Sequence, residues 1–64
     1  MKLYETPRNS RIRIMDEEGD IVLDKDGEDL ILDFRHVDGM YSLCYDKYGE
    51  MVHIAAWTDV EVMP

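Results

Sequence analysis

The sequence predicts an all-β fold, a small barrel of five or six short antiparallel strands with one short 3-10 turn before the last strand. Apolar residues alternate with polar ones or stand in short blocks, and helical periodicity is almost absent. Glycine-containing turn sequences separate these blocks at short intervals. The 64 residues are enough for one domain, so we expect residues 1–64 to form a single small β-barrel domain.

The first half of the chain predicts one clear strand and two turns. Residues 3–9 contain a proline and predict an irregular lead-in. Residues 11–15 alternate between apolar and basic side chains, which is typical of a half-buried strand. Turns are expected at residues 16–20 and 24–27, with a short strand at residues 21–23 between them.

Asp38-Gly39 is a strong hairpin signal in the middle of the chain. A two-residue loop at this dipeptide pairs Phe34 with Leu43 and sends Ser42 and Cys44 to the outer face. The resulting apolar face carries Leu32, Phe34, His36, Tyr41, Leu43 and Tyr45.

The turn at residues 46–49 allows two registers for the next strand. A four-residue loop places Leu43 opposite Val52, whereas a three-residue loop places it opposite His53. We expect the four-residue loop, because it extends the apolar face.

Residues 55–59 are too short for an α-helix and predict the single 3-10 turn, followed by a last strand at residues 60–62. This order of elements resembles the SH3-like small barrel, in which the last strand pairs with the first. We expect Trp57 to close one end of the core, with a partner-facing position as the alternative.

Four segments also resemble short uncharacterised proteins of large tailed bacteriophages. They are Leu3-Tyr4, Pro7 to Ser10, Asp38 to Ser42 and Val52 to Thr58. This resemblance implies a viral protein in a bacterial cytoplasm, and it implies no activity. The absence of a long apolar run also predicts a cytoplasmic protein without a signal peptide or membrane span.

Charge is concentrated in one part of the chain. Residues 16–33 contain nine acidic residues and one lysine, which together account for the whole net charge of −8. Such a field favours basic partners and repels nucleic acid and anionic membranes. The predicted partner-binding residues are Asp16, Glu17, Glu18, Asp20, Asp24, Asp26, Glu28 and Asp29; the alternative is a solvated loop region.

No residue set predicts catalysis, a metal site or a cofactor. The acids after Asp24 resemble the opening of a calcium loop, but Asp29 and Arg35 stand where that loop needs glycine and glutamate. Cys44 and His53 fall on one predicted face, yet the chain has only three Cys and His residues, too few for a structural zinc site.

A basic stripe could hold single-stranded nucleic acid by stacking bases on Tyr4 or Tyr48. The stripe consists of Arg8, Arg11 and Arg13. The net charge argues against this function, and we expect these arginines to pair with the acidic loops.

The sequence therefore predicts a non-enzymatic interaction module that binds a basic surface of a host or viral protein through its acidic residues. A sharper form of this hypothesis is a nucleic-acid mimic. Trp57 and Tyr48 are possible aromatic contacts. The alternative is a barrel that binds a small ligand or nucleotide. Large exposed apolar areas on Met40, Met51 or Met63 would favour its assembly into an oligomer.

Overall fold

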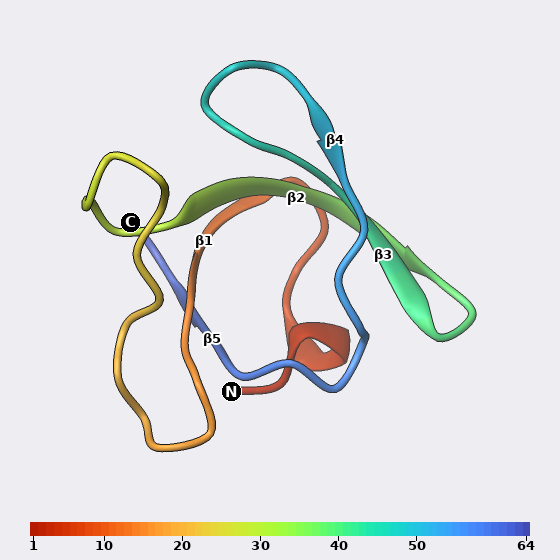
Figure 1. Cartoon of the computed structure of the whole chain (residues 1–64). Coiled ribbons are helices and arrows are strands. Elements are labelled where there is room, and N and C mark those ends of the chain that lie inside the picture. The colour runs from red at the N-terminus through yellow and green to blue at the C-terminus, as the bar shows by residue number, and fades with distance from the viewer.

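Five antiparallel strands form one sheet in the computed structural model, which describes residues 1–64 (Figure 1). The elements are η1 (Leu3–Glu5), β1 (Ser10–Ile14), β2 (Ile31–Asp38), β3 (Tyr41–Tyr45), β4 (Met51–Val52) and β5 (Val60–Val62). The strand order is β4-β3-β2-β1-β5, so the last strand pairs with the first. The predicted all-β class is confirmed.

The long connection between β1 and β2 is tied back to the sheet by a triangle of backbone hydrogen bonds. The Val22 N–H donates to the Ile14 carbonyl at 2.9 Å, the Leu30 N–H to the Val22 carbonyl at 2.8 Å, and the Ile14 N–H to the Leu30 carbonyl at 3.2 Å. The strand expected at residues 21–23 consists only of two isolated bridges, formed by Ile21 and Leu23.

Three turns share one sequence pattern and one geometry. Each reads aspartate, two variable residues, glycine and an acid, over residues 16–20, 24–28 and 46–50. In each turn the aspartate Oδ1 accepts hydrogen bonds from the backbone N–H groups two and four residues later, at 2.8 to 3.1 Å. The glycine has a φ between 79° and 85°, which L side chains rarely adopt.

This geometry corrects the expected register of β4. The Asp46 N–H donates to the Glu50 carbonyl, which leaves a three-residue loop at residues 47–49. Cys44 therefore lies opposite Val52, and the four-residue loop was a wrong prediction. The reason is local, because an aspartate-closed turn that ends in a left-handed glycine fits three loop residues.

The β2–β3 hairpin also differs from the expected register. Its loop is Gly39-Met40, and Phe34 lies opposite Cys44 because a bulge interrupts β2 between Phe34 and His36. Phe34 and Leu43 therefore do not face each other, and Leu43 belongs to the outer face. The expected apolar face was wrong: only Leu32 and Phe34 of that set are buried, while His36, Leu43 and Tyr45 are partly exposed and Tyr41 is exposed.

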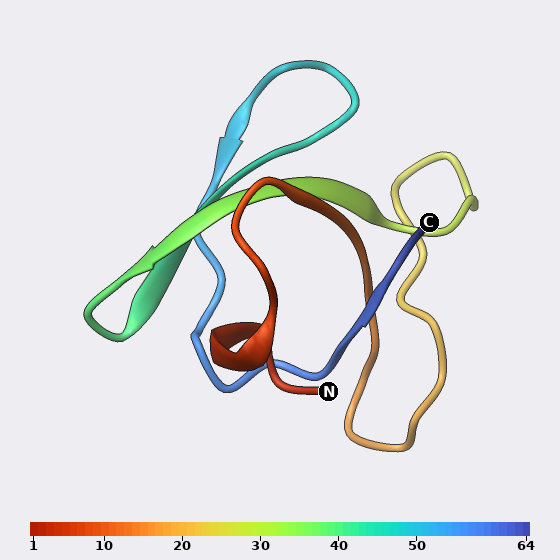
Figure 2. The same ribbon diagram turned by 180° about the vertical axis from the view of Figure 1, so that it is seen from behind.

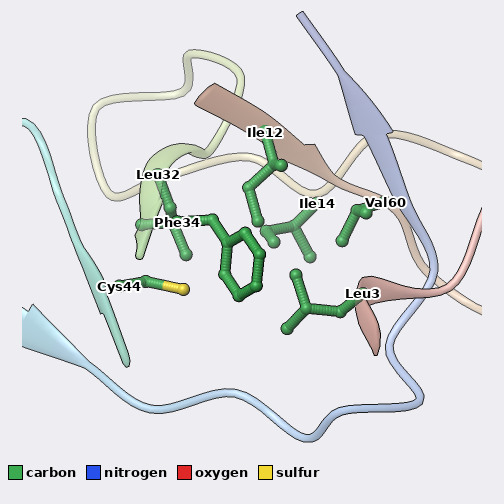
Figure 3. Packing of buried hydrophobic residues seen from close by; sticks show 7 residues of the cluster. All are labelled: Leu3, Ile12, Ile14, Leu32, Phe34, Cys44 and Val60. Atoms are coloured by element: carbon green, nitrogen blue, oxygen red, sulfur yellow. The ribbon is translucent and has the colours of Figure 1, made fainter. Parts of the chain in front are cut away.

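The inner face of the bent sheet encloses a core centred on Phe34 (Figure 3). Its seven buried residues are Leu3, Ile12, Ile14, Leu32, Phe34, Cys44 and Val60. Leu3 is fully buried, so the segment expected to be an irregular lead-in contributes to the core.

η1 lies beside the segment that leads into β5, as Figure 2 shows from behind. The Leu3 N–H donates to the Thr58 carbonyl at 2.9 Å and the Tyr4 N–H to the Ala56 carbonyl at 3.0 Å. A tight turn before β5 is present, closed by the Thr58 N–H and the Ala55 carbonyl, but the 3-10 helix itself is η1. No helix here has the length and apolar character needed to cross a membrane.

Candidate interaction surface

The second acidic turn, residues 24–28, is partly neutralised by a lysine from the third turn. The Lys47 Nζ lies 3.1 Å from an Asp24 carboxylate oxygen, 3.0 Å from one of Asp26 and 3.6 Å from one of Glu28. We call these three carboxylates the Lys47 cage. Hydrogen bonds to Asp26 and Asp24 raise the pKa of Lys47 above its usual value. The cage thus joins two turns that are distant in the sequence.

Two carboxyls of the cage, those of Asp24 and Asp26, have a lowered pKa. The Glu28 backbone N–H, assisted by Lys47, lowers the pKa of Asp24. The Tyr48 hydroxyl donates a hydrogen bond to Asp26 and, with Lys47, lowers the pKa of that carboxyl. The Lys25 ammonium also lies over the Tyr48 ring, 4.5 Å from its centroid, in a cation–π contact. Tyr48, a predicted aromatic contact, is therefore engaged within the chain.

The first acidic turn, Asp16–Asp20, has no such compensation. All its side chains are exposed, and none of its four acids has a lysine, arginine or histidine nitrogen within 4.0 Å. The only bonds to its carboxylates come from the backbone N–H groups of Glu18 and Asp20 to Asp16. We call this segment the acidic turn.

The remaining acids of this region are paired with arginines. Arg13 lies 3.3 Å from Asp29 and 3.4 Å from Glu61, and Arg11 lies 3.7 Å from Asp33. The eight predicted partner-binding acids therefore divide into four unpaired and four paired ones. The acidic turn therefore carries half of the net charge of −8 in four acids that pair with no basic side chain.

A hollow lies between the two turns that the cage joins. It has a volume of about 500 Å³ and is bounded by turns 24–28 and 46–50, with Ile31 and Tyr45 among its apolar lining residues. Asp33 and Arg11 also line it. This hollow is the feature that corresponds to the predicted small-ligand alternative.

Four large apolar side chains are exposed together at another part of the surface. We call Tyr4, Met40, Tyr41 and Trp57 the apolar patch. Each is between 53% and 64% exposed. Trp57 is therefore not the expected core residue; Phe34 and Leu3 fill the core instead, and the tight turn at residues 55–58 directs Trp57 outward.

Backbone hydrogen bonds at Ala56 bring the patch together. The Ala56 N–H donates to the Met40 carbonyl at 2.8 Å, and its carbonyl accepts from the Tyr4 N–H at 3.0 Å. Trp57 follows directly in the chain, and its ring centroid lies 6.5 Å from that of Tyr41 with an interplanar angle of 52°. Three segments distant in the sequence thus lie side by side, and two of the four side chains, Tyr41 and Trp57, are in contact.

The acidic turn is linked to the segment that carries Trp57. The Met15 N–H donates a hydrogen bond to the Asp59 carbonyl at 3.0 Å. Met15 directly precedes the acidic turn, and Asp59 lies two residues after Trp57. This bond therefore holds the start of the acidic turn beside the segment that leads from Trp57 into β5. In Figure 1 both the orange acidic turn and the blue segment before β5 occupy the lower side.

Cys44 and His53, expected on one face, lie on opposite faces. Cys44 is fully buried in the core, and burial raises the pKa of its thiol. His53 is exposed, and its Nδ1 lies 2.9 Å from the Ser42 carbonyl oxygen. No group of three or more potential ligands is placed to hold a metal ion.

Sequence reasoning did not bring Tyr4, Met40 and Tyr41 together with Trp57. Tyr41 was assigned to the core because the expected register placed it there. One feature of the sequence could have indicated that Met40 is exposed. Met40 follows Gly39 in the short hairpin loop, and residues of exposed loops rarely belong to a core.

Comparisons with known proteins found no match for this chain. No protein-family model, curated protein or solved structure is significantly similar to it.

Proposed function

We propose that this protein is an interaction module that binds a basic, partly apolar segment of another protein at the apolar patch and the acidic turn. The observation that carries the proposal is the exposure of four large apolar side chains, Tyr4, Met40, Tyr41 and Trp57, on three segments that meet at Ala56. The phage resemblance would place this partner in an infected bacterial cell.

The composition of the patch favours a protein partner. Tryptophan, tyrosine and methionine are enriched at protein interfaces, and tryptophan and tyrosine supply a large share of binding energy there. Contiguous exposed apolar surface is uncommon on small monomeric proteins without a binding role. The partner therefore offers an apolar side chain to Trp57 and Tyr41.

The charge of the acidic turn favours a basic partner. The four acids of this turn pair with no basic side chain of the chain, and the net charge is −8. Charge complementarity of this kind raises the association rate and excludes acidic partners more than it adds raw affinity. Binding should therefore weaken as salt rises, since exposed charges are screened over about 8 Å at physiological ionic strength.

A displayed library of random 12-residue peptides tests the proposal. We expect the selected peptides to combine lysine or arginine with an aromatic or aliphatic side chain. Isothermal titration at low and high salt then measures their affinity for the wild type and for Trp57→Ala, which should bind about thirtyfold more weakly, as expected when an interface tryptophan is removed. Trp57→Phe is the matched control and should retain most of the affinity.

A second variant tests the acidic turn. It replaces Asp16, Glu17, Glu18 and Asp20 with their amides, and the side-chain amide at position 16 still offers the oxygen that closes the turn. We expect a clear loss of affinity at low salt that shrinks at high salt, whereas Asp33→Asn, which removes an acid already paired with Arg11, should change little. Selection of peptides without excess basic residues, or equal affinity for all variants, would contradict the proposal.

The hollow beneath the Lys47 cage supports a second candidate function, the binding of a small ligand. Its volume of about 500 Å³ lies within the usual range for ligand pockets. A fragment screen by NMR tests this function. Shifts at Ile31 and Tyr45 would support it, and shifts confined to the apolar patch would count against it.

A further inference from the structure

The edge of the sheet next to β4 has unused backbone hydrogen-bonding groups. Residues 51–55 run along β3 on one side, through the pairs Cys44 with Val52 and Tyr41 with Ala55. On the other side no strand follows, because β4 is the last strand of the sheet.

Three groups on this free side make no backbone hydrogen bond. They are the N–H and the carbonyl of His53 and the N–H of Ala55. Antiparallel pairing explains this, because Val52 and Ile54 direct their backbone groups toward β3 while the residues between them direct theirs away. The edge thus offers alternate donors and acceptors at the spacing of a β-ladder.

β4 has only two residues, and a short edge strand is one feature that limits strand addition, but residues 51–55 lack other usual protections. Protected edges carry charged side chains, prolines or a covering segment. Residues 51–58 contain no proline and no Lys, Arg, Asp or Glu, and Met51 is 57% exposed. His53 is also exposed.

The outer face beside the edge is hollowed. A depression of about 410 Å³ is lined by side chains that include His36, Leu43, Met51 and His53. An added strand would direct alternate side chains toward this face. Tyr41 lines the same depression and also belongs to the apolar patch, so the edge continues directly into the surface proposed above.

We infer that the edge at residues 51–55 binds an extended basic segment of the partner by β-strand addition. This inference rests on the proposed function and specifies how the same partner binds. Backbone hydrogen bonds to the edge give affinity in this mode, and alternate side chains give specificity. A second copy of the chain is a poor occupant, because each copy carries a net charge of −8.

The test uses an eight-residue peptide of alternating lysine and valine as the probe, and the same peptide with N-methylated valines as its control. NMR titration of the full chain gives both affinities. We expect the unmethylated peptide to bind and the methylated peptide to bind at least about tenfold more weakly, because methylation removes the ladder hydrogen bonds along one edge. In the complex, the backbone amides of His53 and Ala55 should exchange with solvent at least about tenfold more slowly.

Two variants of one residue separate the backbone from the side chain. His53→Pro removes an N–H that has no partner within the chain, and His53→Ala keeps it. We expect His53→Pro to lose the peptide and His53→Ala to retain it. If His53→Pro fails to fold, the comparison of the two peptides on the wild type decides the question.

The outcomes distinguish this inference from the proposed function. Equal affinity for the methylated and unmethylated peptides, absence of binding, or a dimer formed without peptide would overturn strand addition. The four-amide variant of the acidic turn should weaken both peptides alike. If that variant binds as the wild type does while methylation still matters, the electrostatic part of the proposed function fails and the strand addition stands.

Discussion

Replacement of Leu3 with alanine tests whether η1 is an integral part of the core. Leu3 is fully buried and packs with Phe34, Ile14 and Val60 in the single core cluster. Leucine-to-alanine substitutions at such sites cost about 2 to 5 kcal/mol. A domain of this length has a free energy of unfolding of about 3 to 10 kcal/mol, so the substitution should remove a large part of it.

Urea denaturation followed by circular dichroism measures the effect. With a denaturant dependence of about 1 to 2 kcal/mol per molar urea for a small domain, the midpoint should fall by at least about 1 M. Leu3→Val, which removes one methylene, should fold and lose about 1 kcal/mol. Tyr4→Ala changes the exposed neighbour on the same turn and should stay within about 0.5 kcal/mol. If Leu3→Ala were as stable as Tyr4→Ala, η1 would not belong to the core.

Three further predictions concern the turns and the register. The pKa values of Asp24 and Asp26 are lowered in the folded state, so their contribution to stability should be present above the unfolded value of 3.8 and disappear as pH falls below it. Acid titration of wild type and Lys47→Met measures this contribution, and an identical acid transition in both would contradict the cage. Gly49→Ala should cost about 1 to 2 kcal/mol in urea unfolding, because the φ of 79° strains an L residue although no atom lies within 4 Å of its Cβ. The buried Cys44 thiol should react with a thiol reagent only as fast as the protein unfolds. A Leu43→Cys, Cys44→Ala variant, whose thiol lies on the outer face, should react rapidly. Fast labelling of Cys44 in the wild type would instead support the register in which Cys44 faces outward.

The sequence was sufficient to predict the strands whose pattern is purely local. The alternation around Ile12 and Ile14 predicts β1, and Val60 and Val62 predict β5. The approximate position of each turn was also predictable, although not its loop length or register, because aspartate and glycine have few alternative roles at that spacing. The pairing of β5 with β1 followed from the order of the elements.

The register of β2, β3 and β4 was not predictable from alternation. A bulge at Arg35 inserts one residue and reverses which side chains face the core beyond it, so Val37 packs inward and His36 does not. Nothing in the alternation marks that residue. The loop at Gly39-Met40 adds a second shift, since glycine occupies its first position with a φ of 67°.

The charge of the candidate site could be predicted from the sequence, but the arrangement of its side chains could not. The acids between residues 16 and 33 are evident from composition, but their division into paired and unpaired groups depends on Lys47, more than twenty residues beyond the start of the second turn. The exposure of Trp57 depends on Leu3, which fills the space that a large ring would otherwise occupy. Both are contacts between distant segments.

The three aspartate-closed turns have a consequence for variation of this protein. Their frame uses only the first aspartate, the glycine and backbone groups, so the side chains of the two central residues are not needed to close any of the turns. These residues are Glu17-Glu18 in one turn, Lys25-Asp26 in another and Lys47-Tyr48 in the third. One scaffold thus displays three different dipeptides; the side chains of Glu17 and Glu18 make no hydrogen bond or ion pair with another turn, whereas the other two dipeptides also hold their turns together through Lys47, Tyr48 and Asp26.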